Sequence, residues 1–428
     1  MSSINSNNNK IKLLKGDSIY SSLSDQNKLF LETISSKYKF SYQELRQLSV
    51  ISADFSMWKS KSVRDYIIEI ESENAAGLHK KDILKILVSR WNDLKDSKTQ
   101  YESQSSKIRE RPAPRKVTVS DSQNEVFGMC PVASEKTVCC NLMTIDAVQG
   151  CSLGCSYCSI QTFYTDGKIS IDKNLAEKLS KIPLDPSKNY HIGSGQSSDS
   201  LAIGNREGVL DAQLEFARKN SNIILEFKTK SSNIDHLVKT DVPKNVFVSW
   251  SLNPQLFIDN EEHGTASLDQ RISSARRLSD KGILIGFHFH PIVYYENYEK
   301  DYSDVVKKVM TTFEPSEIAM ISMGTLTFIK PAIQKLRSTG LSSKVLQIPM
   351  ADAVGKSSYT REIKAEIFNQ VYSQFHHWHD RVFFYLCMEE SAVWESVFGE
   401  YYSSNTEFEN ALFESVHSKM YSLESATL

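Results

Sequence analysis

The stretch Cys151-Ser152-Leu153-Gly154-Cys155-Ser156-Tyr157-Cys158 carries three thiols at C-x₃-C-x₂-C spacing. Cysteines this close together, in a chain with only seven cysteines, favour a metal site over disulfides. A structural zinc site is closed by four ligands, and no second Cys or His pair follows at the required spacing. A [4Fe–4S] cluster held by three thiolates keeps one iron open for a ligand that is not protein. The count of three therefore favours such a cluster, and a zinc or purely structural site is the alternative.

The composition is that of an ordinary globular chain. Its 428 residues are 40% hydrophobic and 24% charged, and the length suggests two or three domains. Since the formal net charge is only −2, any contact with nucleic acid has to come from a local basic patch. No apolar stretch approaches the length of a membrane span, and residues 1–9 lack an apolar signal core. We therefore expect a soluble, cytoplasmic protein.

The N-terminal part is predicted to be helical after a polar start. Residues 1–19 are rich in Ser and Asn and are predicted to be a disordered tail. Residues 20–100 carry apolar side chains at three- and four-residue spacing, which predicts an all-helical module. Within it, Ser41 and Glu44 match a capping box. The pattern favours a docking or packing module, and a DNA-binding helix-turn-helix stays open.

A basic, proline-containing linker is predicted over residues 101–125. It concentrates five cations around two prolines: Lys107, Arg109, Arg111, Arg115 and Lys116. Two interpretations stand side by side, a solvated linker and an extended arm that contacts phosphates.

From about residue 141 onward, apolar runs alternate with helical patterns, which predicts βα units around a parallel sheet. The strand candidates are residues 142–148, 190–193, 223–227, 246–250, 283–289 and 318–323. Six such units fit an α/β fold, a partial (β/α)6 barrel over residues 126–398, followed by a C-terminal helical extension over residues 399–428. Active sites of such barrels lie at the carboxyl ends of the strands, where the cysteine motif also falls because it follows the first strand.

Tyr157, directly before the last cysteine, completes a motif that resembles the radical SAM superfamily. Over most of residues 141–398 the chain resembles one family within it, the spore photoproduct lyases. The stretches that carry this resemblance are Gly150-Cys151 through Gln161-Thr162, Ser197-Ser198-Asp199, Phe227-Lys228-Thr229-Lys230, Ile234-Asp235-His236-Leu237, Ser249-Trp250-Ser251-Leu252-Asn253, Glu262-His263-Gly264-Thr265, Leu268-Asp269 with Arg271-Ile272, Gly286-Phe287-His288-Phe289-His290-Pro291, and Tyr385-Leu386-Cys387-Met388-Glu389 with Trp394. The helical N-terminal module lies outside the resemblance.

The resemblance implies cofactors and the residues that bind them. Cys151, Cys155 and Cys158 match the ligands of a [4Fe–4S] cluster, and Tyr157 matches the aromatic residue beside S-adenosylmethionine (SAM). Further positions match SAM contacts to the methionine amino group, the carboxylate and the ribose: Gly193, Ser194, Gly195, Ser197, Lys230 and Ser251. A cation or hydroxyl suits a carboxylate, and a short polar side chain suits a ribose.

The resemblance also implies an activity. Spore photoproduct lyases use a 5′-deoxyadenosyl radical to repair a thymine dimer in DNA, so we expect a radical SAM lyase that acts on DNA and receives electrons from a carrier such as flavodoxin or ferredoxin. One alternative is a radical SAM enzyme acting on RNA, a peptide or a small molecule. Another is a non-catalytic iron–sulfur sensor that binds DNA. The complete set of SAM positions favours an enzyme.

Two positions depart from the family pattern. Gln196 stands where the family keeps the cysteine that returns a hydrogen atom, and an amide has no weak X–H bond to give. Ser159 replaces a second tyrosine. Cys140 and Cys387 are the candidate hydrogen donors in place of residue 196. The alternatives are a tyrosine donor, return of the hydrogen atom from 5′-deoxyadenosine, and an oxidised product to which no hydrogen returns. Cys140 and its neighbours Cys130 and Cys139 have inert buried thiols as their alternative interpretation, and Cys387 has core packing. His288 and His290 share one strand face, as substrate-binding or as core residues.

Overall fold

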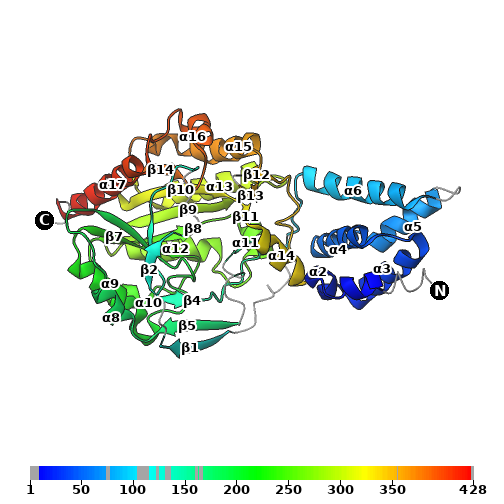
Figure 1. Cartoon of the computed structure of the whole chain (residues 1–428). Coiled ribbons are helices and arrows are strands. Elements are labelled where there is room, and N and C mark those ends of the chain that lie inside the picture. Colours follow the sequence, from blue (N-terminus) through cyan, green and yellow to red (C-terminus); the bar gives the residue numbers. More distant parts are fainter. Residues whose placement is uncertain are drawn as a thin grey trace. The chain divides into compact units, whose positions relative to one another are not determined.

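The computed structural model describes residues 9–73, 78–103, 115–121, 125–130, 136–159, 162, 167–353 and 355–425. The chain divides into two compact units (Figure 1). One unit consists of Met1–Tyr101 with Thr327–Tyr359, and the other of Glu102–Leu326 with Thr360–Leu428. No helix in the described part of the chain is both long and apolar enough to cross a membrane.

The larger unit is built on a curled eight-stranded sheet with the order β14-β10-β9-β8-β7-β6-β3-β2 (Figure 1). All neighbours pair in parallel except the antiparallel pair β2 and β3. The strands are β2 (Phe127–Met129), β3 (Met143–Ile145), β6 (Tyr190–Ser194), β7 (Ile223–Thr229), β8 (Val246–Ser251), β9 (Ile285–Ile292), β10 (Ile318–Thr325) and β14 (Phe383–Leu386). Their apolar runs are buried almost throughout, as expected for parallel strands covered on both faces. The predicted α/β class and the run of parallel strands agree with this sheet.

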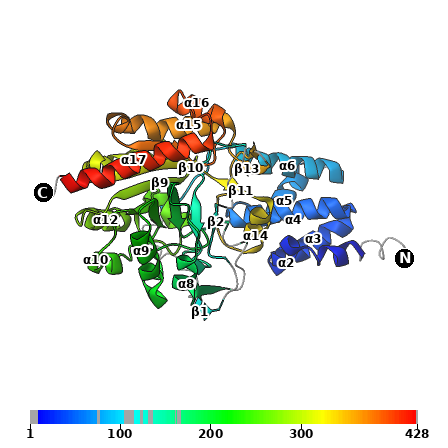
Figure 2. The ribbon, with the colours of Figure 1, turned by 60° about the vertical axis from the view of Figure 1, so that its left-hand side comes forward.

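Helices connect the strands and cover the sheet. Figure 2 shows α12 beside β9, and α17 running along β10. The helices of this unit are α8 (Leu175–Ser180), α9 (Val209–Lys219), α10 (Asp235–Lys239), α11 (Gln255–Glu261), α12 (Leu268–Ser279), α13 (Tyr298–Thr312), α15 (Arg361–Tyr372), α16 (Ser391–Phe398) and α17 (Asn405–Ser425), with short 3₁₀ turns at Arg206–Gly208, Pro315–Glu317 and Ser373–Trp378. The predicted C-terminal extension is thus a helix that packs on this unit.

A second, three-stranded sheet has the order β1-β5-β4. β1 (Lys116–Ser120) pairs in parallel with β5 (Lys168–Asp172), and β4 (Val148–Gln149) pairs with β5 in the antiparallel sense. The predicted single strand over residues 142–148 is therefore two strands in different sheets. The end of the predicted linker is likewise a strand, because Val117 and Val119 alternate with polar residues.

In the described N-terminal part of the chain, the smaller unit contains a helical segment at residues 9–14 and then the helices α2 (Ser18–Ser22), α3 (Asp25–Tyr38), α4 (Tyr42–Met57), α5 (Val63–Glu73) and α6 (Lys80–Asp96). The predicted capping box is present, since Glu44 N donates to Ser41 Oγ at 3.3 Å and Ser41 N donates to Glu44 Oε2 at 2.6 Å.

The unit is not purely helical, because the segment Thr327–Tyr359 joins it. That segment contains α14 (Lys330–Ser338) and strands β11 (Thr327–Phe328), β12 (Ala351–Ala353) and β13 (Lys356–Ser358), paired in the order β11-β13-β12. Arg337 of α14 donates to both oxygens of the buried Asp54 at 2.7 and 2.8 Å, and Trp91 Nε1 donates to Asp54 at 2.9 Å. The sequence prediction placed this segment inside the barrel domain. The segment belongs to the smaller unit instead, where Arg337 forms an ion pair with Asp54, a residue far away in the sequence.

Two further boundaries differ from the prediction. Residues 9–14 are already helical and Leu14 is fully buried, so the predicted tail of residues 1–19 is too long. Its Ser- and Asn-rich character belongs to residues 1–8, which lie outside the described residues. Lys107, Arg109 and Arg111 also lie outside the described residues, whereas Arg115 leads into β1 and Lys116 begins it.

Candidate active site

The cysteine motif forms a loop that begins two residues after β4, and the segment that follows α11 holds this loop in place. Cys155 forms an antiparallel bridge with Glu262, and Ser156 N donates to Glu261 O at 2.9 Å. Gly264 N donates to Leu153 O at 2.8 Å. A Cβ at position 264 would lie 2.7 Å from Leu153 O, so only glycine permits this approach. Cys155 is buried, and Cys151 and Cys158 are half-buried.

Tyr157 is fixed by a buried ion pair. Its hydroxyl donates to Glu262 Oε1 at 2.5 Å, and Arg271 Nη2 donates to Glu262 Oε2 at 2.5 Å. Both side chains of the pair are fully buried. Burial alone would raise the pKa of Glu262, but Arg271 and then Lys230 hold it below its usual value. Glu262 is therefore an ionised carboxylate that orients the tyrosine.

The same arginine fixes the end of β8. Arg271 Nη1 donates to Ser251 O at 2.8 Å, while Nε donates to Ala266 O at 3.0 Å. Asn253 Nδ2 adds a third hydrogen bond to Glu262, at 2.9 Å. The predicted SAM residue Ser251 and the motif residue Tyr157 are thus held by one network.

Lys230 and Ser251 lie at the carboxyl ends of neighbouring strands. Thr229 is paired with Trp250, so the same register brings Lys230 beside Ser251. Lys230 Nζ lies 6.0 Å from the centroid of the Tyr157 ring. The Ser251 hydroxyl is buried and has no hydrogen-bond partner in the described structure. A buried hydroxyl without a partner is costly, so this one fits a polar ligand group.

Asp199 positions the backbone around Lys230. Its carboxylate accepts from Lys230 N and from Thr229 Oγ1, both at 2.7 Å. It also accepts from the backbone of Leu201 and Ala202 at 3.0 and 2.9 Å. Asp199 thus joins the loop after β6 to the end of β7.

The predicted Gly193-Ser194-Gly195 stretch ends β6 and turns away from it. Gly195 has φ +85°, and a Cβ there would meet Ser200 Oγ at 2.5 Å. Ser197 Oγ lies 2.8 Å from Asp146 Oδ1 and from Val148 O, and Ser197 O accepts from Gly150 N at 3.0 Å. Ser197 therefore fastens this loop to the entrance of the cysteine motif, and its predicted contact with SAM stays a prediction.

The thiols of the motif have the chemistry of cluster ligands. Burial raises the pKa of Cys151 to about 12 and raises that of Cys155 as well, so ionised sulfurs here need a cation. Within the described ranges, no three His, Cys, Asp or Glu side chains are arranged to hold a metal ion. The assignment of Cys151, Cys155 and Cys158 as ligands therefore stays a prediction based on spacing and position.

A polar network lies on the inner side of the sheet. Glu226 Oε2 lies 2.9 Å from His191 Nε2, and Glu226 Oε1 lies 2.5 Å from His288 Nε2 and accepts from Ser249 Oγ. Burial, followed by the charge of Lys228, lowers the pKa of His288 to about 4, so this imidazole is neutral. His288 is thus a satisfied internal histidine, while the half-buried His290 contacts Ser322 Oγ at 3.1 Å.

Lys228, on the same face of β7 as Glu226 and Lys230, is a cation without a hydrogen bond or ion pair in the described structure. Burial lowers its pKa, and the charges of Cys387 and Glu226 act in the opposite direction. Tyr385 is buried, and burial raises its pKa, with the charges of Cys140, Glu226 and Cys387 acting in the same direction.

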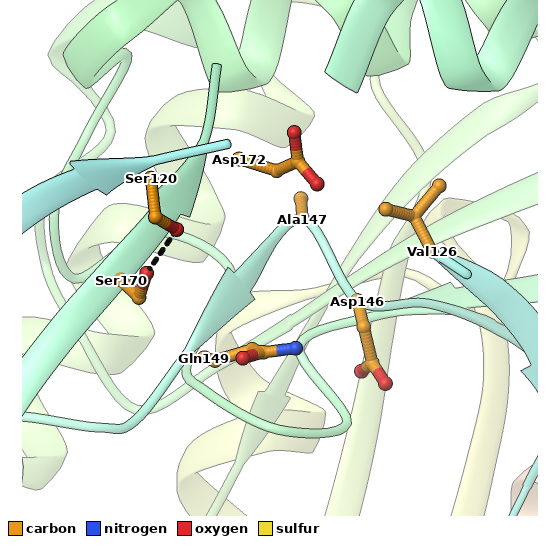
Figure 3. A pocket seen from close by; sticks show the side chains of 7 residues that line it. All are labelled: Ser120, Val126, Asp146, Ala147, Gln149, Ser170 and Asp172. Atoms are coloured by element: carbon orange, nitrogen blue, oxygen red, sulfur yellow. Dashed lines mark hydrogen bonds between the residues drawn. The ribbon is translucent and has the colours of Figure 1, made fainter. Parts of the chain in front are cut away.

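A small pocket elsewhere in this unit is lined by residues of β1, β4 and β5 and of the segments before β2 and after β3: Ser120, Val126, Asp146, Ala147, Gln149, Ser170 and Asp172 (Figure 3). Ser120 and Ser170 share a hydrogen bond of 2.7 Å at one side. Its two carboxylates are already engaged, Asp146 by Ser197 and Asp172 by Lys178. We assign it no ligand.

The model of the family described as Spore photoproduct lyase matches residues 136–346, just under half of the chain. The spore photoproduct lyase of Clostridium acetobutylicum is 30% identical over 178 residues, covering 40% of this chain and 52% of the relative. That of Bacillus subtilis is 27% identical over 167 residues, covering 37% and 48%. The chain thus spans about half the length of the curated relatives it matches.

Solved structures share the fold. A spore photoproduct lyase complexed with dinucleoside spore photoproduct superposes with a TM-score of 0.54 at 21% identity, covering 63% of this chain and 82% of that chain. A variant of spore photoproduct lyase with bound AdoMet and dinucleoside spore photoproduct gives a TM-score of 0.53 at 20% identity, with the same coverage.

Several site residues were missed at the level of sequence. Glu262, Arg271 and Asp199 stand in the stretches that carry the family resemblance, but nothing local predicts their contacts. The sequence could have pointed to Lys228 and Glu226, because both residues alternate with Lys230 along one strand and so lie on the same face as Lys230.

Proposed function

We propose that this chain is a radical SAM enzyme of the spore photoproduct lyase type, which repairs a thymine-dimer lesion in DNA. The larger unit would be a partial (β/α)6 barrel of that class. The match of residues 136–346 to the model of that family supports the class of chemistry. The substrate is a proposal drawn from the relatives, which are lyases of the spore photoproduct.

One observation carries the proposal. An ammonium group, a buried hydroxyl without a partner and the aromatic ring of the cysteine motif converge at the ends of β7 and β8, as Lys230, Ser251 and Tyr157. A zwitterionic, ribose-bearing ligand such as SAM would supply a carboxylate as the partner of Lys230 and a ribose hydroxyl as the partner of Ser251.

The residues take the following roles. Cys151, Cys155 and Cys158 would hold a [4Fe–4S] cluster, which with SAM supplies a 5′-deoxyadenosyl radical when bound. Lys230 would bind the carboxylate of SAM and Ser251 its ribose. Glu262 and Arg271 keep Tyr157 and the end of β8 in position. The backbone of Gly193, Ser194 and Gly195 would face the amino group, with Ser197 supporting that loop.

DNA is the proposed substrate, and an electron carrier of the flavodoxin or ferredoxin class is the proposed partner. A thymine dimer in duplex DNA has to leave the base stack to reach a site inside a curled sheet. Gln196 is half-buried in the loop after β6 and cannot donate a hydrogen atom, so another residue would return it.

The test uses full-length chain reconstituted anaerobically with iron and sulfide. Cys151→Ala, Cys155→Ala and Cys158→Ala should each lose the brown chromophore and the reductive cleavage of SAM to 5′-deoxyadenosine. Cys130→Ser, which alters a cysteine outside the motif, should keep both. Full cluster incorporation in all three alanine variants would overturn the ligand assignment. Cleavage of SAM without repair of any thymine dimer would favour a substrate of another class.

A further inference from the structure

A chain of hydrogen bonds crosses the inner side of the sheet and ends at His290. Glu226 Oε1 lies 2.5 Å from His288 Nε2, and His288 Nδ1 forms a hydrogen bond with Ser322 Oγ. Ser322 Oγ in turn lies 3.1 Å from His290 Nε2. Four side chains from β7, β9 and β10 are therefore linked, and His290 is the half-buried one among them.

The carboxylate at the start of this chain fixes the direction of each hydrogen bond. Burial alone would raise the pKa of Glu226, but His288 and then His191 hold it well below its usual value, so Glu226 is ionised and only accepts. His288 Nε2 therefore donates to Glu226. Because burial lowers the pKa of His288 to about 4, the ring is neutral, and its Nδ1 accepts from the hydroxyl of Ser322. Ser322 Oγ is then the acceptor for His290 Nε2.

The same logic leaves one nitrogen of His290 as an acceptor. Burial lowers the pKa of His290 well below its usual value, so a ring that donates through Nε2 carries no proton on Nδ1. Nδ1 has no hydrogen bond within the part of the chain that the structure describes. His290 thus presents a free lone pair.

Lys228 lies in the same layer of side chains as His290. Ser249 Oγ donates to Glu226 Oε1 and lies 3.1 Å from His288 Nε2, which places one layer across the parallel strands β7, β8 and β9. Two residues further along these strands, on the same face, the next layer consists of Lys228, Ser251 and His290. Lys228 and His290 therefore lie on either side of Ser251, the proposed ribose contact.

These two side chains offer a donor and an acceptor to one ligand. Lys228 is half-buried, and its ammonium group has no hydrogen bond or ion pair among the described residues. A phosphate or carboxylate would suit Lys228, but it would place its own lone pairs against His290 Nδ1. A ring carbonyl beside an N–H group satisfies both side chains, and the imide edge of a thymine base has this arrangement.

We propose that Lys228 and His290 recognise the imide edge of one thymine of the lesion. Lys228 donates to a ring carbonyl oxygen, and His290 Nδ1 accepts from the N3–H group. The proposal rests on the proposed function and deepens it, because it names the residues that select the base. It also places this base next to SAM, since Ser251 lies between the two side chains.

Equilibrium binding under anaerobic conditions tests the contact of His290. The reconstituted full-length chain is given SAM but no reductant, so that nothing turns over. The ligands are a dinucleotide carrying the spore photoproduct and two analogues, each methylated at N3 of one base. Wild type should bind one of the analogues about 3- to 10-fold more weakly than the parent, the effect of one hydrogen bond between neutral groups. His290→Ala should lose this preference, and His376→Ala, on an exposed histidine, should keep it.

Ser322→Ala makes the same test with a smaller change. It removes the partner that fixes the proton on His290 Nε2, so the preference should fall although the ring remains. The cluster chromophore and the affinity for SAM show which variants are folded. A preference that survives unchanged in the folded variants would overturn the assignment of His290.

Lys228→Met tests the donor. It should weaken binding of the parent dinucleotide about 10-fold or more, because a hydrogen bond from a charged group is the stronger kind. The affinity for SAM should stay unchanged, and Lys239→Met, on an exposed lysine, should change neither. Weaker SAM binding with unchanged dinucleotide affinity would place Lys228 in the SAM site and overturn the proposal.

The wild-type chain separates this proposal from the proposed function. Equal affinity for the parent and both methylated analogues would overturn the imide contact alone. No binding of any thymine-dimer dinucleotide would overturn the proposed substrate, and the recognition of its base with it.

Discussion

At the scale of single residues, Lys230 and Ser251 are the test of where SAM binds. Lys230→Ala should leave the cluster chromophore intact and weaken SAM binding about 10- to 100-fold, because a hydrogen bond to a charged group contributes roughly 1.5–3 kcal/mol. Equilibrium binding of SAM to the reconstituted chain measures this. Lys239→Ala, on an exposed lysine of α10, serves as the control. Unchanged SAM affinity with reduced turnover would move Lys230 to the substrate side.

The buried pair of Glu262 and Arg271 makes a separate prediction about stability. Arg271→Met leaves an uncompensated buried carboxylate, so the free energy of unfolding should fall by about 3–5 kcal/mol. Denaturant titration measures the change, with Arg277→Met on the exposed face of α12 as the control. Adding Glu262→Gln should recover part of the loss, and a double variant no more stable than Arg271→Met would argue against a charge effect.

The same pair sets the sign of a pH dependence. The pKa of Glu262 is lowered in the folded chain, so its contribution to stability is present above the ordinary pKa of a glutamate. That contribution is lost as the pH falls through the lowered value. The difference in stability between wild type and the Arg271→Met, Glu262→Gln double variant should therefore shrink on acidification.

At the scale of elements, the segment after α11 supports the cysteine loop through Gly264. A Cβ at this position meets Leu153 O at 2.7 Å, so Gly264→Ala should displace the loop and lower cluster incorporation. Overpacking of this kind costs about 1–3 kcal/mol. The iron content and visible spectrum after reconstitution report the effect. Gly128→Ala, where no atom lies within 4 Å of the new Cβ, is the matched control and should bind the cluster normally. Equal iron content in the two variants would contradict the supporting role.

Most strands of the larger sheet were predictable because long apolar runs indicate buried parallel strands. β6, β7, β8, β9 and β10 all fall within or overlap the predicted stretches. The assignment of residues 327–337 to the barrel was wrong, since the helical pattern is real but its partner Asp54 lies far away in the sequence. β5 was missed because Lys168–Asp172 is short and only half apolar. The local apolar pattern predicts a helix or strand, whereas the unit that it joins depends on contacts with residues far away in the sequence, such as the ion pair of Arg337 with Asp54.

The candidate site also contains residues that the sequence predicts and residues whose roles only the folded structure shows. The spacing of the cysteines predicts a cluster site from the sequence alone. Lys230 and Ser251 are predictable as well, because they follow or end predicted strands. The roles of Asp199, Glu262 and Arg271 depend on hydrogen bonds that only the folded chain brings together.

At the scale of the whole molecule, the basic segment of residues 107–116 makes a prediction about DNA affinity. Neutralising its five cations should weaken binding and flatten the salt dependence, by about 0.9 in slope for each phosphate that the segment no longer neutralises. Fluorescence anisotropy over a series of salt concentrations measures the slope. Neutralising the exposed Lys300 and Lys307 of α13 is the control. An unchanged slope would reduce the segment to a linker.

We propose above all that the chain uses SAM to reverse a thymine dimer. The most direct measurement is an anaerobic incubation of the reconstituted chain with dithionite, SAM and a dinucleotide carrying the spore photoproduct, followed by chromatography of the products. We expect the repaired dinucleotide, with its two thymine bases no longer linked, and 5′-deoxyadenosine to appear with wild type, and neither to appear with Cys155→Ala. Equal amounts of repaired dinucleotide with wild type and Cys155→Ala would contradict the proposed function. A substrate left intact while wild type cleaves SAM would also contradict it.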